Sequence, residues 1–209
     1  MRKKSAAMLF IMCLAVLLHS SSYAAVQTSQ LQRAWGKIAS SAQLQHAPKV
    51  SIEDNEEPNA WVSFSMNQYS VHVTTGMLKI LQTEDQIAGI LGHETGHIKL
   101  GHYKETMGRN LLWVLLYRAF GSKDSKLDPL ALGLALAESG FSRQQEVEAD
   151  DYGIRLAARA GYDPWGLVQS LEIMKKAGYQ TSPSGFNSHP PTERRLIHVT
   201  DTAKEVASH

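Results

Sequence analysis

The spacing of hydrophobic positions predicts a helix, then a small sheet, then mostly helices. Hydrophobic residues recur every three or four positions over 28–45, which is typical of an amphipathic helix. Short β-rich segments at 50–52, 60–65 and 69–74 are separated by turn-forming residues and predict a small antiparallel sheet. This order of elements, with no linker and no internal repeat, predicts a single α+β domain that is mostly helical.

Helix-start signals mark the elements that follow the predicted sheet. Thr83 stands three residues before Gln86, and Ser142 stands three residues before Gln145. Both spacings are those of a capping box, in which the two side chains satisfy the first free backbone N–H groups of a helix. Helices are expected over about 83–101, 142–161 and 163–178, and from 192 onward.

Two apolar segments, 111–120 and 130–137, lie between these helices. A helix needs about 20 apolar residues to span a bilayer, and each segment is shorter. The segments therefore predict buried helices. Contact with a membrane is the alternative, because periodicity alone does not separate the two cases.

The first 24 residues have the features of a secretory signal peptide. Basic residues at 2–4 precede an apolar run from Ala6 to Leu18, and small residues lead to an expected cleavage point after Ala24. We therefore expect a cleaved signal peptide over 1–24, a folded domain over 25–209 and export from the cytoplasm. An uncleaved membrane anchor is the alternative.

Composition narrows the chemistry that the chain can support. Its 209 residues include nine histidines and one cysteine, Cys13, which lies inside the expected signal peptide. A single cysteine excludes a disulfide framework and any multi-cysteine zinc site, so histidine and carboxylate must hold any metal. The formal charge of +1 gives no electrostatic case for binding nucleic acid.

Residues 93–97 read His-Glu-Thr-Gly-His, which has the form H-E-x-x-H. Because positions i and i+4 share one face of a helix, His93 and His97 can reach one metal ion. Zinc lowers the pKa of a bound water to about 7, so Glu94 can act as the general base at neutral pH. A chance occurrence of the motif is the alternative.

The expected helix after Ser142 offers further groups for the same site. Glu146 and Asp150 are four residues apart and share one face, so Glu146 is a candidate metal ligand and Asp150 a candidate acceptor for a ligand histidine. Glu148 is expected to be solvated. His102, five residues after His97, is expected to lie at a helix end or on the surface. A plain acidic helix start is the alternative for the whole segment.

Taken together, the two motifs resemble the M48 zinc metallopeptidases, a group of gluzincins with integral-membrane and soluble periplasmic members. Further matching segments are 58–61, 73–78 and 188–195. The resemblance implies a zincin-like domain with one zinc ion per chain. It assigns the zinc to His93, His97 and Glu146, the water to Glu94, and a supporting position behind the ligands to Asp150.

The resemblance also implies roles for residues near the C-terminus and in the sheet. In the periplasmic members, a histidine in a His-Pro-Pro segment caps the zinc and holds the enzyme latent, and the match is His189. Arg195 is a candidate for stabilising the oxyanion. The segment from Asn59 to Phe64 is expected to form an edge strand on which an extended peptide pairs backbone to backbone.

The function that follows from the motifs and the resemblance is zinc-dependent endopeptidase activity in the bacterial periplasm. Its expected partners are unfolded or misfolded envelope proteins as substrates, with no nucleic acid. Peripheral contact with a membrane or with outer-membrane assembly machinery is a further expectation. The alternatives are a latent or chaperone-like zinc-binding protein with little proteolytic activity, and a purely structural helical domain. No oligomeric state follows from the sequence.

Overall fold

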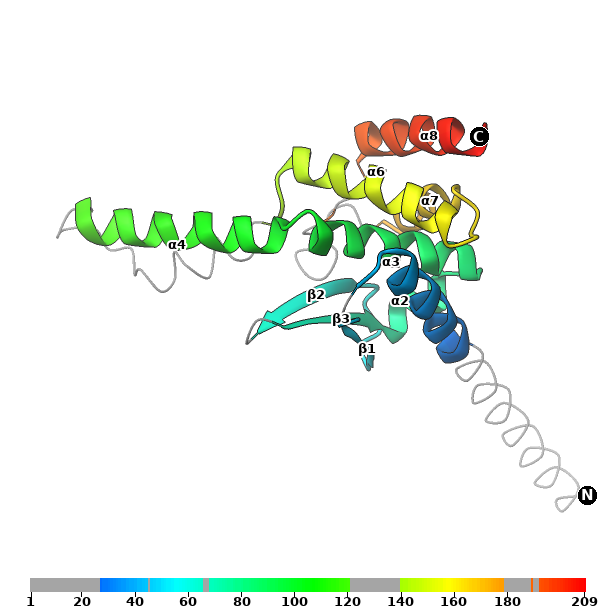
Figure 1. Ribbon diagram of the computed structural model, residues 1–209, viewed down its shortest axis with the longest axis horizontal. Coiled ribbons are helices and arrows are strands. Elements are labelled where there is room, and N and C mark those ends of the chain that lie inside the picture. The colour runs from blue at the N-terminus through cyan, green and yellow to red at the C-terminus, as the bar shows by residue number, and fades with distance from the viewer. Residues whose placement is uncertain (1–26, 45, 66–67, 121–139, 179–188, 190–191) are drawn as a thin grey trace, which may run out of the picture.

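The computed structural model of the protein describes the following residues: 27–44, 46–65, 68–120, 140–178, 189 and 192–209. Figure 1 draws these residues in colour from the N-terminus to the C-terminus. The expected signal peptide over 1–24 and the apolar segment 130–137 lie outside them.

The sheet has three strands in the order β1-β3-β2, with bounds Lys49–Glu53 for β1, Ala60–Ser65 for β2 and Gln68–Thr74 for β3. β2 pairs antiparallel with β3, as expected. β1 runs parallel to β3, with Val50 opposite Val71, so the sheet is mixed and the expectation of a wholly antiparallel sheet is corrected for this pair. The chain between β1 and β3 contains all of β2, which supplies the crossover that a parallel pair needs.

Helices form the rest of the described domain. Residues 27–41 are helical, and the labelled helices are α2 (Thr75–Ile80), α3 (Glu84–Lys99), α4 (His102–Phe120), α6 (Arg143–Arg159), α7 (Gly166–Lys176) and α8 (Glu193–Ala207). The Thr83 hydroxyl accepts a hydrogen bond from the backbone of Gln86 at the start of α3. Ser142 and Gln145 form a complete capping box at the start of α6. The two capping-box helix starts and the mostly helical α+β class are therefore confirmed, whereas the helix expected from 163 begins at Gly166.

α3 lies at the centre of the molecule. In Figure 1 the sheet lies on one side of α3, α6 and α7 lie on the other, and α8 packs beyond them. Leu91 of α3, Ile154 of α6 and Leu171 of α7 are fully buried in one apolar cluster. Burying a side chain of this size contributes about 1.5–3 kcal/mol, so this packing holds α3 and α6 in a fixed relation.

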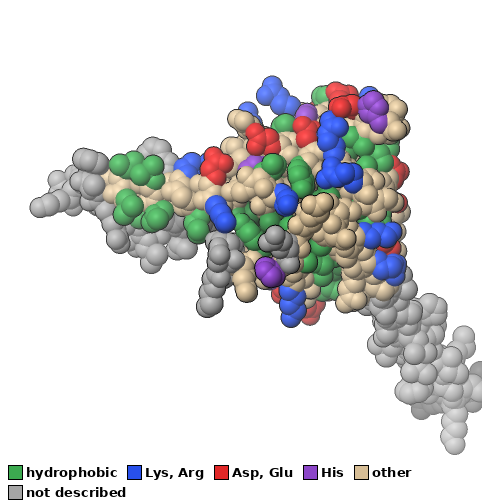
Figure 2. Space-filling model, in the orientation of Figure 1, with side chains coloured by type: hydrophobic (Ala, Val, Ile, Leu, Met, Phe, Trp, Pro, Cys, Tyr) green, Lys and Arg blue, Asp and Glu red, His purple; other side chains and the backbone are tan. Residues whose placement is uncertain are grey.

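α4 leaves the body of the domain as a projecting arm (Figure 1). Leu111, Leu112 and Leu115 are 58%, 55% and 53% exposed, and Figure 2 shows hydrophobic side chains along this arm. The expectation that 111–120 is a buried helix is therefore wrong at these positions, because α4 diverges from α3 instead of folding back onto the core. No described helix is both long and apolar enough to cross a membrane.

Candidate metal centre

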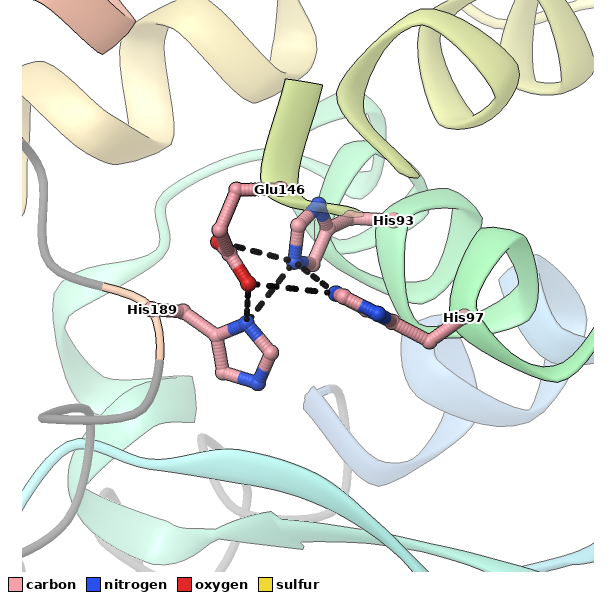
Figure 3. A group of neighbouring side chains, drawn as sticks. All are labelled: His93, His97, Glu146 and His189. Atoms are coloured by element: carbon pink, nitrogen blue, oxygen red, sulfur yellow. Dashed lines mark hydrogen bonds and ion pairs between the residues drawn. The ribbon is translucent and has the colours of Figure 1, made fainter. Parts of the chain in front are cut away.

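Four side chains from three separate parts of the chain converge beside α3. His93 and His97 come from α3, Glu146 from the first turn of α6, and His189 from the segment that precedes α8 (Figure 3). All four are buried, and one candidate ligand atom from each lies within 4.8 Å of the others. The structure thus brings together every residue that the sequence and the resemblance put forward as a metal ligand.

Glycines on the facing sides of α3 and α6 make this convergence possible. A Cβ atom on Gly92 would lie 2.7 Å from the Gly153 carbonyl oxygen, and one on Gly96 would lie 2.8 Å from the Ala149 carbonyl oxygen. Real Cβ atoms do not approach backbone this closely, so only glycine fits at these crossings. The two helix backbones therefore lie near enough for the short Glu146 side chain to reach the histidines of α3.

The separations between the candidate ligand atoms fit a single small metal ion. His93 Nε2 lies 3.1 Å from His97 Nε2 and 3.1 Å from His189 Nδ1. Glu146 Oε1 lies 3.4 Å from His97 Nε2 and 2.7 Å from His189 Nδ1. Ligand atoms at 2.0–2.1 Å from a tetrahedral zinc ion are about 3.3 Å apart, so these residues fit zinc.

Asp150 fixes the orientation of His93. Its Oδ1 atom lies 2.8 Å from His93 Nδ1, and both side chains are fully buried. The imidazole donates its Nδ1 hydrogen to the carboxylate, which leaves the Nε2 lone pair directed at the centre. Burial raises the pKa of Asp150, but the adjacent Arg195 charge and the hydrogen bonds lower it by more. The net pKa is therefore below that of an ordinary aspartate. The expected supporting role of Asp150 fits this geometry.

The Arg195 guanidinium binds the carboxylates of the site. Nε and Nη2 donate to Asp150 at 2.8 and 2.7 Å. Nη1 donates to the His189 carbonyl oxygen at 2.8 Å and lies 3.1 Å from Glu146 Oε2. In this arrangement Arg195 binds groups that hold or form the candidate metal site. Its contact with an oxyanion stays a prediction.

The electrostatics of Glu146 and His97 favour metal binding. Those of His189 do not, because burial lowers its pKa but the charges of Glu146 and Glu94 raise it more, which favours the protonated imidazole. Burial raises the pKa of Glu146, but the charges of His189 and Arg195 lower it more, and the net value is far below that of an ordinary carboxyl group. Burial lowers the pKa of His97 well below its usual value. A carboxylate that stays ionised and an imidazole that stays neutral are the protonation states in which these groups bind a metal.

Glu94 is buried beside the histidines, and one of its oxygens makes no hydrogen bond to the described residues but lies 3.9 Å from His189 Nε2. Its Oε2 accepts a hydrogen bond from the Tyr103 hydroxyl at 3.0 Å, whereas Oε1 has no hydrogen-bond partner among the described residues. Leaving a buried carboxylate oxygen unsatisfied is costly, so this atom suits a water molecule or another polar group. The Tyr103 hydroxyl also accepts the Val62 backbone N–H of β2 at 3.2 Å.

The sequence analysis missed three residues of this site. His102 was expected at a helix end or on the surface; it is the first residue of α4, but it is 2% exposed and its Nδ1 lies 3.0 Å from His97 Nδ1. Glu148 was expected to be solvated, but its half-exposed carboxylate lies 3.1 Å from His102 Nε2. Tyr103 had no assigned role. Helical spacing gave no signal for them, because each reaches the site across the junction between α3 and α4 or from another helix.

A mostly helical α+β domain with an H-E-x-x-H helix and a buried histidine–glutamate cluster defines the zincin-like class of metallopeptidase domains. Residues 25–203 match the profile of "Peptidase family M48". The chain therefore belongs to peptidase family M48, and the resemblance drawn from its motifs is confirmed.

Three proteases illustrate what the chain is similar to. Metalloprotease LoiP of Escherichia coli (strain K12) is 34% identical over 145 residues, which cover 66% of this chain and 57% of that protein. Metalloprotease YcaL of the same strain is 32% identical over 151 residues, covering 68% and 57%. The β-barrel assembly-enhancing protease of Escherichia coli O157:H7 is 29% identical over 167 residues, covering 73% and 34%. The chain thus spans little more than half the length of the first two relatives.

Proposed function

We propose that the protein is a zinc-dependent endopeptidase that hydrolyses peptide bonds with a metal-activated water. The observation that carries this proposal is the convergence of His93, His97 and Glu146 on one point, beside a Glu94 Oε1 atom that has no hydrogen-bond partner among the described residues. Membership of peptidase family M48 supports the same reaction. One zinc ion per chain is proposed, held by these two histidines and Glu146.

When bound, zinc would supply the Lewis acidity that polarises the scissile carbonyl and acidifies a water molecule. In the proposed mechanism Glu94 takes a proton from the attacking water as the water oxygen bonds to the scissile carbonyl carbon, and it later delivers that proton to the amine nitrogen as the C–N bond breaks. Asp150 keeps His93 in the metal-binding tautomer. Tyr103 restrains one oxygen of Glu94, which leaves the other oxygen for the proton transfer.

The proposed substrate-binding edge is strand β2. β2 is an edge strand of the sheet, and the Val62 N–H donates a hydrogen bond to the Tyr103 hydroxyl. A backbone edge that faces the site is suited to pairing with an extended peptide. This supports the expectation that the segment from Asn59 to Phe64 positions the substrate, with Tyr103 occupying one of its donors in the absence of a peptide.

We further propose that His189 holds the protein latent. A catalytic zinc site keeps one position open for water or substrate, and His189 lies where it would take that position as a fourth protein ligand. Because Arg195 Nη1 donates to the His189 carbonyl, withdrawal of His189 would also release an Arg195 donor for the oxyanion. His189 and Arg195 would then act together in opening the site.

A second candidate function is a latent or chaperone-like zinc-binding protein with little proteolytic activity. The closed set of four buried candidate ligands favours it, because structural zinc sites are filled by protein on all sides. The two candidates differ in whether His189 leaves the centre. Cleavage that appears only when His189 is removed would support an enzyme whose resting state is closed.

The proposed location is the periplasm, with removal of a signal peptide over 1–24 to leave a domain over 25–209. The composition of the first 24 residues supports this location. Unfolded or misfolded envelope proteins are the proposed substrates. The exposed apolar side of α4, which includes Leu111, Leu112 and Leu115, supports peripheral contact with a membrane or with outer-membrane assembly machinery.

The experiment that tests this function combines metal analysis with cleavage of casein. We expect the wild type to bind one zinc ion and to cleave casein. If His189 keeps the wild type latent, His189→Ala is the background in which cleavage is measured. Glu94→Gln in the same background should keep the zinc but lose about 10²–10⁴-fold in rate. Glu56→Gln, at an exposed carboxylate paired with Lys79, is the matched control and should cleave normally. Cleavage that survives in Glu94→Gln would remove Glu94 from the mechanism, and a protein without zinc would overturn the proposal.

A further inference from the structure

We propose that His102 and Glu148 position His97 for metal binding by fixing its tautomer through a chain of hydrogen bonds. This inference rests on the proposed zinc site and adds two positioning residues to it. His97 Nδ1 lies 3.0 Å from His102 Nδ1, and His102 Nε2 lies 3.1 Å from Glu148 Oε2. The chain therefore runs from a carboxylate on α6, through an imidazole on α4, to a candidate ligand on α3.

The chemistry of the three groups fixes the direction of each hydrogen bond. An ionised carboxylate only accepts, so the His102 hydrogen must be on Nε2, where it is donated to Glu148. Neutral imidazole has a single N–H, so His102 Nδ1 is an acceptor. His97 must then donate from Nδ1, which leaves the lone pair on its Nε2 atom. That atom is the one that lies 3.1 Å from His93 Nε2 in the metal cluster.

The opposite assignment would prevent His97 from binding the metal. If His102 carried its hydrogen on Nδ1, it would donate to His97 Nδ1, and neutral His97 would have to carry its own hydrogen on Nε2. A nitrogen that bears a hydrogen has no lone pair for a metal ion. Glu148 excludes this arrangement, because it would place two acceptors, its own carboxylate and the His102 Nε2 lone pair, against each other.

Local structure holds the chain of hydrogen bonds in place. Gly101 adopts a positive φ of 77°, which favours glycine and turns the chain between α3 and α4. His102, in the first turn of α4, is 2% exposed. Gln144 Nε2 donates to Glu148 Oε1 at 2.9 Å, which steadies the carboxylate while its other oxygen accepts from His102.

The two histidines of the motif are therefore oriented in different ways by the same helix. Asp150 of α6 accepts directly from His93 Nδ1 at 2.8 Å. Glu148 of α6 acts on His97 through His102. Outer hydrogen bonds of this kind orient ligand imidazoles, and their removal typically lowers metal affinity about 10–100-fold. We expect the His102 chain to have an effect of that size.

Zinc affinity, measured by competition with a chromophoric chelator on the full chain, tests the proposal without relying on activity. His102→Leu removes the acceptor and should weaken zinc binding about 10–100-fold. His102→Asn can offer its Oδ1 atom close to the original Nδ1 position and should restore most of the affinity. Glu148→Ala should weaken binding by less than His102→Leu, because His102 stays in place but loses its fixed tautomer.

The matched control uses the other histidine–carboxylate contact made by α6. His198 Nε2 lies 2.9 Å from Asp151 Oδ1. This contact is partly exposed and does not involve the candidate ligands, so His198→Leu should leave zinc affinity unchanged. Equal zinc affinity in wild type and His102→Leu would overturn the proposal but leave the proposed zinc enzyme standing. A wild type that binds no zinc would overturn both.

A second measurement is independent of whether His102→Leu folds. Nitrogen-15 spectra of the histidine side chains of the zinc-loaded wild type distinguish the two ring tautomers. We expect His102 to carry its hydrogen on Nε2 and His97 to carry its hydrogen on Nδ1. The reverse tautomer of His102 would overturn the proposal.

Discussion

Gly92 of α3 and Gly153 of α6 touch backbone to backbone. A Cβ atom on Gly92 would lie 2.7 Å from the Gly153 carbonyl oxygen, and one on Gly153 would lie 2.6 Å from the His93 backbone nitrogen. The closeness of the two helices therefore depends on the absence of side chains at this crossing. Because Glu146 reaches the metal cluster from α6, the same crossing sets the geometry of the candidate zinc site.

Gly153→Ala should force α3 and α6 apart. Overpacking of this kind typically costs about 1–3 kcal/mol of the free energy of unfolding, and the displacement of Glu146 should also weaken zinc binding. Urea denaturation and zinc titration measure the two effects. Gly108→Ala in α4, where a Cβ meets nothing within 4 Å, is the matched control and should keep both properties. Unchanged stability in Gly153→Ala would mean that the helices do not need this close approach.

His189→Ala should raise proteolysis several-fold at saturating zinc, because it opens the fourth position of the proposed site to water and substrate. Loss of one nitrogen ligand should also lower zinc affinity, so bound zinc must be measured beside peptide cleavage. His46→Ala, at an exposed histidine that precedes β1, is the control and should change neither property. No gain in cleavage with full zinc occupancy would count against the latency role.

Tyr103→Phe should lower both KM and kcat for a peptide substrate. The Val62 N–H that Tyr103 occupies becomes available to the peptide, which lowers KM, and Glu94 loses a restraining hydrogen bond, which lowers kcat. One hydrogen bond contributes about 0.5–1.5 kcal/mol, so each change should be about two- to tenfold. Tyr152→Phe on α6 serves as the control. A raised KM would show that Tyr103 helps to bind the substrate instead of competing with it.

Acid should weaken the attachment of α3 to its neighbours at Glu84. This carboxylate accepts from the Arg33 guanidinium at 2.9 Å and from the Tyr162 hydroxyl at 2.7 Å. Burial raises the pKa of Glu84, but these contacts lower it more, so its pKa in the folded protein is below the ordinary value of a glutamate carboxyl group. The stabilisation is therefore complete above that value and is lost as pH falls through the folded pKa.

Glu84→Gln tests this pH dependence. At pH 7 the variant should lose about 1 kcal/mol of unfolding free energy relative to wild type, and the difference should shrink below about pH 4. Urea denaturation across this range measures it. Glu205→Gln, which breaks an exposed ion pair with Arg155, should have little effect at any pH. A difference that grows toward acid pH would contradict the assignment.

Local sequence rules were sufficient to predict where the capped helices begin and that the two motif histidines share one helix face. The caps at Thr83 and Ser142 depend only on residues three positions away, and the structure confirms both helix starts. His93 and His97 share a face because helix geometry repeats about every four residues. The same rule paired Glu146 with Asp150, whose side chains both point toward α3. The parallel β1–β3 pairing was missed, because local hydrophobic patterns do not specify the relative direction of two paired strands.

By itself, the sequence determined the mostly helical α+β class, the metal-binding motif and the residue types that could hold a metal. The tertiary structure alone decided that Glu148 contacts His102 and that Arg195 binds the carboxylates of the site. It also decided that Leu111, Leu112 and Leu115 on α4 are exposed. Helical periodicity specifies which side chains share a face, and composition specifies what chemistry they carry. Contacts between residues far apart in sequence depend on how closely helices cross, and at this site the crossing is set by Gly92 against Gly153.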